Sequence, residues 1–486
     1  MRRLSWTLLV VLGCGEDTPA NDEESSGSSS EGGSSGTMST TMSTTIADSS
    51  SSSVGTSVDS SSTTGGAVCG DGVVEGDEPC DDGNDIDDDA CSNDCTEHCA
   101  LAWEAVIDPE PTLVQSIVQV VRDANGDLVM VATLEPLDGS TPPVAWVAKY
   151  DAAGTEIWSG VRGAEGTTPA DVAVDDAGAI YVVGQTEAEA GDTDGLVLAL
   201  DADGTEGWSR IIAGANAADD AVTGIAIADD GDLVIGGTIA DVAMESDALV
   251  SKLAASDGSD VWTQTFTGTP APNGFSLDEG GHVAIDAAGD VIASWTLYVD
   301  FDSAPGSLTK LAIADGTTIW DTHEFGGIGD EREEHSESLA LGPDGEILVD
   351  YQGCVGGQCF SNVYRVPADG MGGELLDLQQ YMGEGEETLY ADGARFDDDG
   401  NLVLGGYFEQ HASGDLHVWI ARVAPDGTTI CQGRHREEMD GFEWIVTNTL
   451  AVGAGNSPVL GGGLIPTGGF VGTNDHAPMW LGSFSP

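Results

Sequence analysis

The sequence carries very little positive charge. Of its 486 residues, 14 are Lys or Arg and 85 are Asp or Glu, which gives a formal net charge of −71. Proteins that bind nucleic acid or anionic membrane surfaces use basic patches, so this balance argues against both as partners. The same charge favours cations as ligands, or a saline medium that screens self-repulsion.

Long apolar runs are absent as well. The chain has no stretch of 18 consecutive apolar residues, so no membrane-spanning helix is expected. No long amphipathic helical pattern occurs either. Glycine, by contrast, is abundant at 68 residues, which is typical of a protein built from many short strands and turns.

The first 14 residues have the composition of an export signal. A basic start (1–3) precedes an apolar stretch (4–12) and the sequence Val-Leu-Gly-Cys, which ends at Cys14. This resembles a bacterial lipoprotein signal and implies removal of residues 1–13 and lipidation of Cys14. An ordinary secretory signal is the alternative. Both imply export, and the first implies an outer-membrane or cell-surface lipoprotein that touches the membrane only through its lipid.

Residues 14–68 consist almost entirely of Ser, Thr, Gly and acidic residues. Such a segment cannot bury enough apolar surface to offset its chain entropy, so we expect it to be disordered. As a flexible coil it would span roughly 40 Å root-mean-square, which is the behaviour of a tether.

A cysteine-rich module follows at residues 69–99. It contains Cys-Gly-Asp-Gly at 69–72, Cys-Asp-Asp-Gly-Asn at 80–84 and Cys-Ser-Asn-Asp-Cys at 91–95. These motifs resemble the myxobacterial cysteine-rich repeat, which implies an exported location more than a chemistry. A module this small cannot form a large core, so disulfides are expected to hold it together. Its cysteines are Cys69, Cys80, Cys91, Cys95 and Cys99.

The same module crowds side-chain oxygens into nine residues. Calcium takes six to eight oxygen ligands, so a calcium site is predicted here, with a solvated acidic turn as the alternative. Zinc is disfavoured because an exported chain should oxidise its cysteines. The candidate ligands are Asp81, Asp82, Asn84, Asp87 and Asp89.

The cysteine count predicts one long-range bond. Apart from Cys14, the module has five cysteines and the rest of the chain has three, and both numbers are odd. Cys354 and Cys359 lie in one glycine-rich hairpin and can pair with each other. If all eight are oxidised, one bond must join the module to the main domain, and Cys99–Cys431 is the first choice. Two free thiols are the alternative.

A short phrase, glycine followed four residues later by tryptophan, recurs along the chain. A second glycine marks a tight turn one hairpin earlier, and its copies are 52 to 58 residues apart, which defines seven units. The phrase occurs at Gly154/Trp158, Gly204/Trp208, Gly258/Trp262 and Gly316/Trp320. The turn glycines are Gly126, Gly178, Gly231, Gly289, Gly345, Gly400 and Gly455.

Each unit has the pattern of four short strands. In the second unit they are predicted at 171–175, 180–185, 195–200 and 207–212. Seven such units predict an all-β fold, a seven-bladed β-propeller of four-stranded blades over residues 100–486. The strand around Trp103 precedes the first unit, and the last unit stops in its third strand near Trp480. We therefore expect the N-terminal strand to complete the last blade and close the ring.

The repeated phrase resembles the propeller repeats of bacterial exported proteins. It is also similar to the tryptophan-docking repeats of quinoprotein-like propellers and of outer-membrane assembly lipoproteins. The resemblance implies the fold but not a function, because propellers host many unrelated activities. Two units depart from the phrase: Leu375 or Leu376 lies near the tryptophan position of the fifth, and Cys431 occupies that position in the sixth.

A basic residue recurs five or six positions before the glycine of the phrase. One interpretation is a cationic ring that gathers an anionic ligand. The other, which we favour, is a set of structural ion pairs with acidic residues of neighbouring blades. The basic residues are Lys149, Lys252, Lys310, Arg365 and Arg422.

One group of loop residues is a candidate metal site. Predicted loops of the sixth and seventh blades carry His411, Asp415, His417 and His476, which adjacent blades could bring together. We favour the simpler interpretation that they are exposed loop residues. The basic cluster at 434–436 is expected to be offset by the acids at 437 and 438.

No sequence pattern identifies a catalytic site. A quinoprotein enzyme of this shape would be expected to have adjacent cysteines, and a sialidase Asp-box turns and an arginine cluster, and neither pattern occurs. The His-Glu-x-x-His motif is absent, and no Gly-x-Ser-x-Gly elbow occurs outside the tether. Carboxylates are too numerous for an acid–base pair to be chosen.

The sequence therefore predicts a monomeric surface lipoprotein whose propeller binds protein or carbohydrate, without catalysis. The alternatives are an extracellular propeller enzyme that acts on a polymer at its central opening, and an envelope-assembly scaffold. Calcium is the one cofactor considered.

Overall fold

A computed structural model describes residues 99–485, apart from short gaps, together with Asp71 and Val73. The predicted signal, the lipidation site Cys14, the tether, the cysteines up to Cys95 and the candidate calcium ligands lie outside the described residues. In the part of the chain that is described, no helix is long and apolar enough to cross a membrane. The gaps are 190–191, 215–217, 243–244, 268–275, 297–305, 326–333, 356–357, 377, 379–386, 411–414, 436–441 and 467–475.

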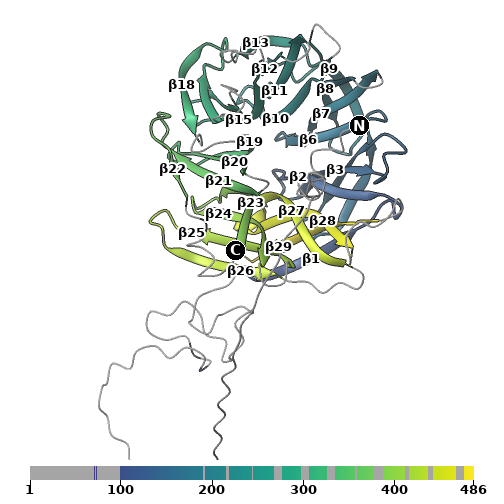
Figure 1. Ribbon diagram of the computed structural model, residues 1–486, viewed down its shortest axis with the longest axis vertical. Coiled ribbons are helices and arrows are strands. Elements are labelled where there is room, and N and C mark those ends of the chain that lie inside the picture. Colours follow the sequence, from purple (N-terminus) through teal and green to yellow (C-terminus); the bar gives the residue numbers. More distant parts are fainter. Residues whose placement is uncertain are drawn as a thin grey trace, which may run out of the picture.

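Seven antiparallel sheets surround a common centre, as the sequence predicted (Figure 1). The first strands of neighbouring sheets contact one another, so these strands are innermost. The first blade contains β2 (Val114–Arg122), β3 (Leu128–Glu135), β4 (Val144–Tyr150) and β5 (Glu156–Arg162), and the second β6 (Thr167–Val174), β7 (Ile180–Glu189), β8 (Asp192–Leu200) and β9 (Glu206–Ile212). The third contains β10 (Ala221–Ile227), β11 (Leu233–Val242), β12 (Glu245–Leu253) and β13 (Asp260–Phe266), with the short β14 (Ser276–Leu277) parallel to β12.

The remaining blades follow the same plan. The fourth contains β15 (Glu279–Ile285), β16 (Val291–Thr296), β17 (Gly306–Leu311) and β18 (Thr318–Phe325), and the fifth β19 (Glu334–Leu341), β20 (Ile347–Val355), β21 (Gln358–Val366) and β22 (Glu374–Leu375). The sixth contains β23 (Glu387–Phe396), β24 (Leu402–Gln410), β25 (Asp415–Val423) and β26 (Thr429–His435). The seventh contains β27 (Phe442–Val452), the 3₁₀ turn η2 (Ala454–Asn456), β28 (Pro458–Pro466), β29 (Met479–Phe484) and, outermost, β1 (Leu101–Ile107).

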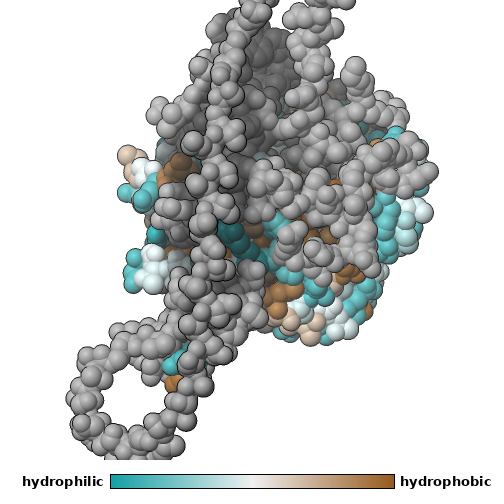
Figure 2. All heavy atoms as spheres, turned by 60° about the horizontal axis from the view of Figure 1, so that its bottom comes forward, coloured by the Kyte–Doolittle hydropathy of each residue, from teal (hydrophilic) through white to brown (hydrophobic). Residues whose placement is uncertain are grey.

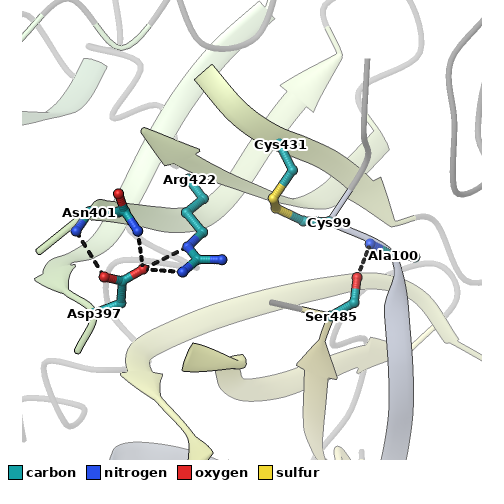
Figure 3. Close-up of a disulfide and its surroundings, with 7 residues drawn as sticks. All are labelled: Cys99, Ala100, Asp397, Asn401, Arg422, Cys431 and Ser485. Carbon is teal, nitrogen blue, oxygen red and sulfur yellow. Dashed lines mark hydrogen bonds and ion pairs between the residues drawn. A yellow bond between two sulfur atoms is a disulfide. The ribbon is translucent and has the colours of Figure 1, made fainter. Parts of the chain in front are cut away.

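The ring closes through its N-terminal strand, which confirms the sequence prediction. β1 pairs antiparallel with β29, and Trp103 lies opposite Ser483. Beyond this pairing, Ser485 N–H donates to Ala100 O over 2.7 Å, and Ala100 N–H donates to Ser485 Oγ over 3.1 Å (Figure 3). The first and last described strands thus form one blade.

Apolar strand residues pack between neighbouring blades. Val131 and Val147 of the first blade, for example, form one buried cluster with Val182 and Leu198 of the second. Each aliphatic side chain buried in this way contributes about 1.5–3 kcal/mol of hydrophobic free energy. Because the middle strands are covered on both sides, they appear in the sequence as continuous apolar runs.

The turns divide the ring into two different faces. Strands alternate in direction, so the turns between strands one and two and between strands three and four lie at the same end of every sheet. We call this end the hairpin face. The connections between strands two and three, and from each blade to the next, lie at the opposite end, which we call the connection face.

The turns on the hairpin face are tight and internally bonded. In the first blade, Gly126 has φ +85°, and Asp123 Oδ1 accepts N–H groups from Asn125 and Asp127. The seventh blade corrects the predicted marker. Asn456, with φ +67°, aligns with the turn glycines of the other blades, and Gly455 lies one residue before it with φ +66°. Asn adopts this left-handed backbone conformation more readily than most other non-glycine residues, so it can replace glycine at this turn position.

Each glycine of the repeated phrase lies under a tryptophan of the preceding blade. A Cβ on Gly204 would lie 2.8 Å from the Trp158 ring, and Trp158 Nε1–H donates to Ala202 O over 3.2 Å. Only glycine permits this close approach. We call this tryptophan–glycine contact a dock. Equivalent docks join Trp103 to Gly154, Trp208 to Gly258, Trp262 to Gly316 and Trp320 to Gly370.

Two positions in this ring of docks are different. In the fifth blade Arg365 pairs with Glu374, where the first, third and fourth blades pair a basic residue with tryptophan. The tryptophan position of this blade is therefore held by Glu374, and Leu375 lies next to it. Glu374 makes no such dock, and no described atom lies within 4 Å of a Cβ built on Gly427, the glycine of the next blade. The other exception is the sixth blade, described below.

Candidate functional site

Cys431 of the sixth blade occupies the tryptophan slot, opposite Arg422. It forms a disulfide with Cys99, the bond that the cysteine count favoured (Figure 3). Cys99 precedes Trp103 by four residues, so it stands where the other blades have the glycine of the phrase. A covalent bond thus replaces the tryptophan–glycine dock at the one junction where the chain ends interrupt the hairpin. Cys354 and Cys359 lie opposite each other on β20 and β21, and their pairing stays a prediction.

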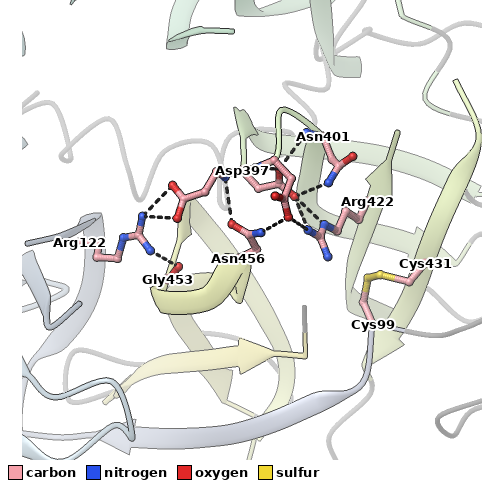
Figure 4. A network of polar contacts seen from close by, with 10 residues as sticks. Cys99, Arg122, Asp397, Asn401, Arg422, Cys431, Gly453 and Asn456 are labelled. Atoms are coloured by element: carbon pink, nitrogen blue, oxygen red, sulfur yellow. Dashed lines mark hydrogen bonds and ion pairs between the residues drawn. A yellow bond between two sulfur atoms is a disulfide. The ribbon is translucent and has the colours of Figure 1, made fainter. Parts of the chain in front are cut away.

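We call the junction of blades six, seven and one the closing seam. On the hairpin face it also carries a polar network (Figure 4). Arg122 of the first blade donates to Gly453 O over 2.6 Å and forms an ion pair with Asp398 at 3.2 Å. Asn456 accepts from Asp398 N–H over 3.0 Å and donates to Asp399 over 2.6 Å. Side chains therefore join three blades on the hairpin face, whereas the backbone passes from blade to blade on the opposite face.

The basic residues predicted as a ring are all engaged in ion pairs. Lys149 Nζ lies 2.6 Å from Asp123 and 3.4 Å from Asp127, both in the turn between the first two strands of its own blade. The other four form the same contact within their own blades: Lys252 with Asp230, Lys310 with Asp286, Arg365 with Glu346 and Arg422 with Asp397.

Neighbouring blades, which the sequence interpretation named, do not supply these partners. The third strand is bonded to the second, so its basic residue ends beside the turn that begins the second strand. The ion pairs are structural, and these cations are already paired with carboxylates instead of facing a ligand.

The pKa values of the paired groups follow from this geometry. Burial alone would raise the pKa of Asp123, but hydrogen bonds from Lys149 and from two backbone N–H groups outweigh it, so the pKa is lowered. Asp286 and Asp397 have lowered pKa values for the same balance of causes. Burial would lower the pKa of Lys149, but its bond to Asp123 raises it. Both partners are therefore held in their charged forms.

The centre of the ring holds a group of ionisable side chains that the sequence interpretation missed. Asp171 (β6), His282 (β15) and Arg395 (β23) come from alternate blades, and we call them the axial group. His282 Nδ1 lies 3.9 Å from Asp171 Oδ2. The charge of Arg395 interacts with those of Asp171 and Asp350. The side chains of three innermost strands therefore converge on the ring axis.

Backbone groups hold the axial group in place. Each innermost strand except β15 has a one-residue bulge, and β15 has an equivalent irregularity of two residues. Asp171 directly follows the bulge of β6 and accepts N–H groups from Val172 over 2.8 Å and from Ile225 of the next blade over 3.0 Å. Burial lowers the pKa of Arg395, while Asp171 and Asp350 act in the opposite direction.

A sequence signal for Arg395 exists in the repeat register. The equivalent position lies five residues before the turn glycine, or before Asn456 in the seventh blade. In each of the six remaining blades this position holds a small aliphatic residue: Val121, Ala173, Ala226, Ala284, Ala340 and Ala451. Arginine is the exception in this series, and only alignment of the units by their turns makes it visible.

The predicted histidine group is only partly described. His417 lies on β25, is buried, and its ring centroid is 5.0 Å from that of Phe408. It is thus neither exposed nor in a loop, which corrects the sequence interpretation. His476 Nε2 lies 3.1 Å from Asp108. His411 and the Asp415 side chain lie outside the described residues, and elsewhere in the described chain no three metal-ligating side chains cluster. Arg434 lies over the Phe408 ring.

The outer strands present separate apolar side chains. Val106, Ile157, Val261 and Ile319 are each about half exposed, on four different blades. Figure 2 shows hydrophobic residues beside hydrophilic ones along the described rim. Isolated exposure of this kind is normal for a soluble surface and defines no site.

Comparison with known proteins assigns neither a family nor an activity to the chain. No family model matches the chain, and no curated protein matches it. A Dyadobacter fermentans protein of unknown function is 12% identical with a TM-score of 0.41, covering 69% of this chain and 97% of its own. The Pseudomonas putida HK5 quinohemoprotein alcohol dehydrogenase is 12% identical with a TM-score of 0.40 (79% and 76% covered).

The β-propeller domain of the Pyrococcus furiosus Trilobed protease, described as having an open velcro topology, is 10% identical. Its TM-score is 0.42, and the match covers 76% of this chain and 95% of that one. Likeness at this level carries no argument about what the chain binds. The fold thus defines a seven-bladed β-propeller whose last blade is shared between the two chain ends.

Proposed function

We propose that the protein is an exported, surface-anchored binding scaffold that holds its propeller away from the membrane on a flexible tether. The observation that supports this proposal is the difference between the two faces of the ring. One face is closed by internal hydrogen bonds and ion pairs, and the described chain enters the ring there at Cys99. The other consists of connections of unequal length.

The hairpin face is suited to support. Its turns are closed by backbone hydrogen bonds, and its basic residues are paired within their own blades. The chain enters the ring at Cys99, at the hairpin end of β1. We infer that the module and the tether, which precede Cys99 in the chain, leave this face toward the anchor.

The connection face is suited to recognition. Its links range from two residues between β11 and β12 to twelve between β28 and β29. Loops of variable length on a rigid scaffold are where binding function concentrates. We therefore place the binding surface for protein or carbohydrate on this face.

The test separates the two faces. The full chain would be used to capture ligands from envelope extract and from a glycan array, beside a variant with residues 467–475 replaced by a Gly/Ser segment of equal length. Its control replaces the exposed residues Asp176 and Asp344, in two turns of the hairpin face, by alanine. Loss of capture only in the first variant is expected. Equal capture by both variants and the parent would contradict a site that depends on this connection.

Anchoring has its own test. Export and lipidation predict recovery of the chain in the membrane fraction, with release of the Cys14→Ser variant. Recovery of the parent chain in the soluble fraction would overturn the anchor. An envelope protein found as the captured partner would favour the scaffold alternative.

Calcium binding by the cysteine-rich module is a separate proposal. It is supported by the oxygen-rich sequence of residues 81–89. Calorimetry on the full chain after chelator treatment is expected to show one calcium site that weakens at least tenfold in an Asp81→Asn/Asp87→Asn variant. Identical calcium titrations of parent and variant would exclude these ligands.

An enzyme acting at the ring centre is the second candidate, and the convergence of the axial group favours it. Asp171 already accepts two backbone N–H groups, which suits a positioned carboxylate more than a mobile base. Hydrolysis of an extracellular polymer by the full chain, abolished in His282→Ala, would support this candidate over the binding scaffold.

A further inference from the structure

One position on the innermost strands breaks the seven-fold pattern. Five blades have alanine and one has valine where the sixth has Arg395. Ala173, Ala226 and Ala284 are partly buried and pack against apolar clusters between neighbouring blades. A long cation therefore stands where its equivalents end in a methyl or isopropyl group.

The Arg395 guanidinium folds back along its own strand. Nη1 donates to Ala394 O over 3.0 Å and lies 3.6 Å from the place where a Cβ on Gly393 would be. Gly393 is the residue after the bulge of β23, equivalent to Asp171 and His282 on their strands. The missing side chain at Gly393 leaves room for the guanidinium at the level of these two residues.

Arg395 has donors left over. A guanidinium carries five N–H groups, and one of them is used in the bond to Ala394. Within the described chain Arg395 forms no ion pair, although every basic residue of the phrase does. Asp171 and Asp350 interact with it only at longer range. A half-buried guanidinium with free donors and no ion-pair partner among the described residues can bind an anion.

We propose that Arg395 binds the carboxylate group of a small ligand on the ring axis, with His282 beside it. The planar fork of arginine matches a carboxylate through two parallel hydrogen bonds. This proposal rests on the proposed binding function and specifies one chemical group of its ligand. The site itself depends neither on the membrane anchor nor on the connection 467–475.

The test uses the full chain with arginine side chains labelled for NMR, titrated with acetate at constant ionic strength and with inorganic phosphate as the second probe. The Nε–H resonance of Arg395, identified by its loss in Arg395→Lys, is expected to shift saturably with acetate. Phosphate is expected to bind more weakly. Arg395→Lys keeps the charge but lacks the fork, so acetate affinity should fall at least tenfold, as measured by calorimetry.

Arg122→Lys is the matched control, because Arg122 forms its contacts on the hairpin face. It should leave acetate affinity unchanged. Three results would overturn the proposal: no saturable shift of the parent resonance, equal affinity in Arg395→Lys, or tighter binding of phosphate. The parent resonance reports on the site without any substitution, so a variant that fails to fold does not remove the test. Absence of ligand capture by the parent chain, with acetate binding intact, would overturn the proposed function and leave this site standing.

Discussion

Single glycines decide how closely neighbouring blades approach. At five junctions a tryptophan ring covers a glycine with positive φ, and a Cβ there would lie 2.6 to 2.8 Å from the ring. Such a glycine meets two demands at once, for backbone conformation and for space. Gly427 meets only the first, since no described atom lies within 4 Å of its Cβ position.

Replacement of Gly204 by alanine should therefore cost more than replacement of Gly427. At Gly427 the cost is the left-handed backbone, about 1–2 kcal/mol. At Gly204 the clash with Trp158 adds about 1–3 kcal/mol. Urea unfolding of both variants measures the difference. Equal losses of stability would show that the tryptophan contact does not contribute.

The ion pairs give stability a defined pH dependence. The folded pKa of Asp123 lies below the unfolded value of 3.8. Its contribution is therefore complete well above pH 3.8, starts to fall near it, and is lost as the pH drops through the folded pKa. The raised pKa of Lys149 acts oppositely: its contribution is present below 10.5 and is lost as the pH rises through the folded value.

The variant Asp123→Asn should lose about 2–3 kcal/mol at pH 7, because it leaves Lys149 with only the more distant Asp127. The loss should shrink as the pH is lowered from 5 to 3 in urea-unfolding measurements. Asp176→Asn, in an exposed turn position, is the control and should show little loss at any pH. A loss that stays constant down to pH 3 would contradict the pairing.

Residue patterns predicted the slots but not always the partners. Tryptophan, glycine and basic residues recur at fixed spacing, so their positions were visible in the sequence. The acid that each basic residue meets depends on strand order, which spacing alone does not give, and the prediction of neighbouring blades was wrong. Glu374 was missed although it lies four residues after Gly370, the spacing of the phrase, because glutamate does not match the tryptophan pattern.

Among the strands, β1 lies at the closing seam and is bonded to its own blade, to the first blade and to the sixth. It is bonded to β29 on one edge, and its tryptophan docks on Gly154 of the first blade. The disulfide at its start binds it to the sixth blade. Nearby, Trp480 Nε1–H donates to Glu104 over 2.9 Å, which ties β1 to its partner strand. The closing seam is held by covalent, polar and aromatic contacts, whereas the other junctions have a tryptophan–glycine dock and a continuous hairpin.

The variant Cys99→Ser/Cys431→Ser should destabilise this strand first. Loss of a disulfide that closes a long loop costs about 2–5 kcal/mol. Hydrogen exchange of β1 amides should accelerate, together with a lower urea midpoint, while β3 amides change less. Unchanged exchange in β1 would mean that strand pairing alone holds the seam.

At the scale of the whole molecule, the chain ends meet within one blade. A circular permutant tests this arrangement: Phe484 is joined to Leu101 through an Asn-Gly turn, new ends open within residues 268–275, and Cys431 becomes serine. Adjacent ends and surface openings favour folding of such a permutant. Circular dichroism and gel filtration should match the parent. Opening the chain within β3 is the control and should prevent folding.

The seven-bladed architecture and its closure were predictable because each repeat carries its own turn and docking residues. The axial group was not predicted, because one arginine among alanines carries no local motif. The axial group can be recognised only in the folded ring, where innermost strands that are distant in the sequence surround one axis. The tether and module are described by sequence alone, and their roles stay predictions.

Sharing the last blade between the chain ends has a consequence for biogenesis. β1 is synthesised before every other strand of the ring and cannot find its permanent partner until β29 has emerged. Until then β1 has an unpaired edge and an exposed tryptophan, and the nearly complete ring lacks its final strand. Closure of the ring must therefore follow synthesis of β29. The disulfide forms under oxidising conditions, and it can then hold the closed ring together covalently.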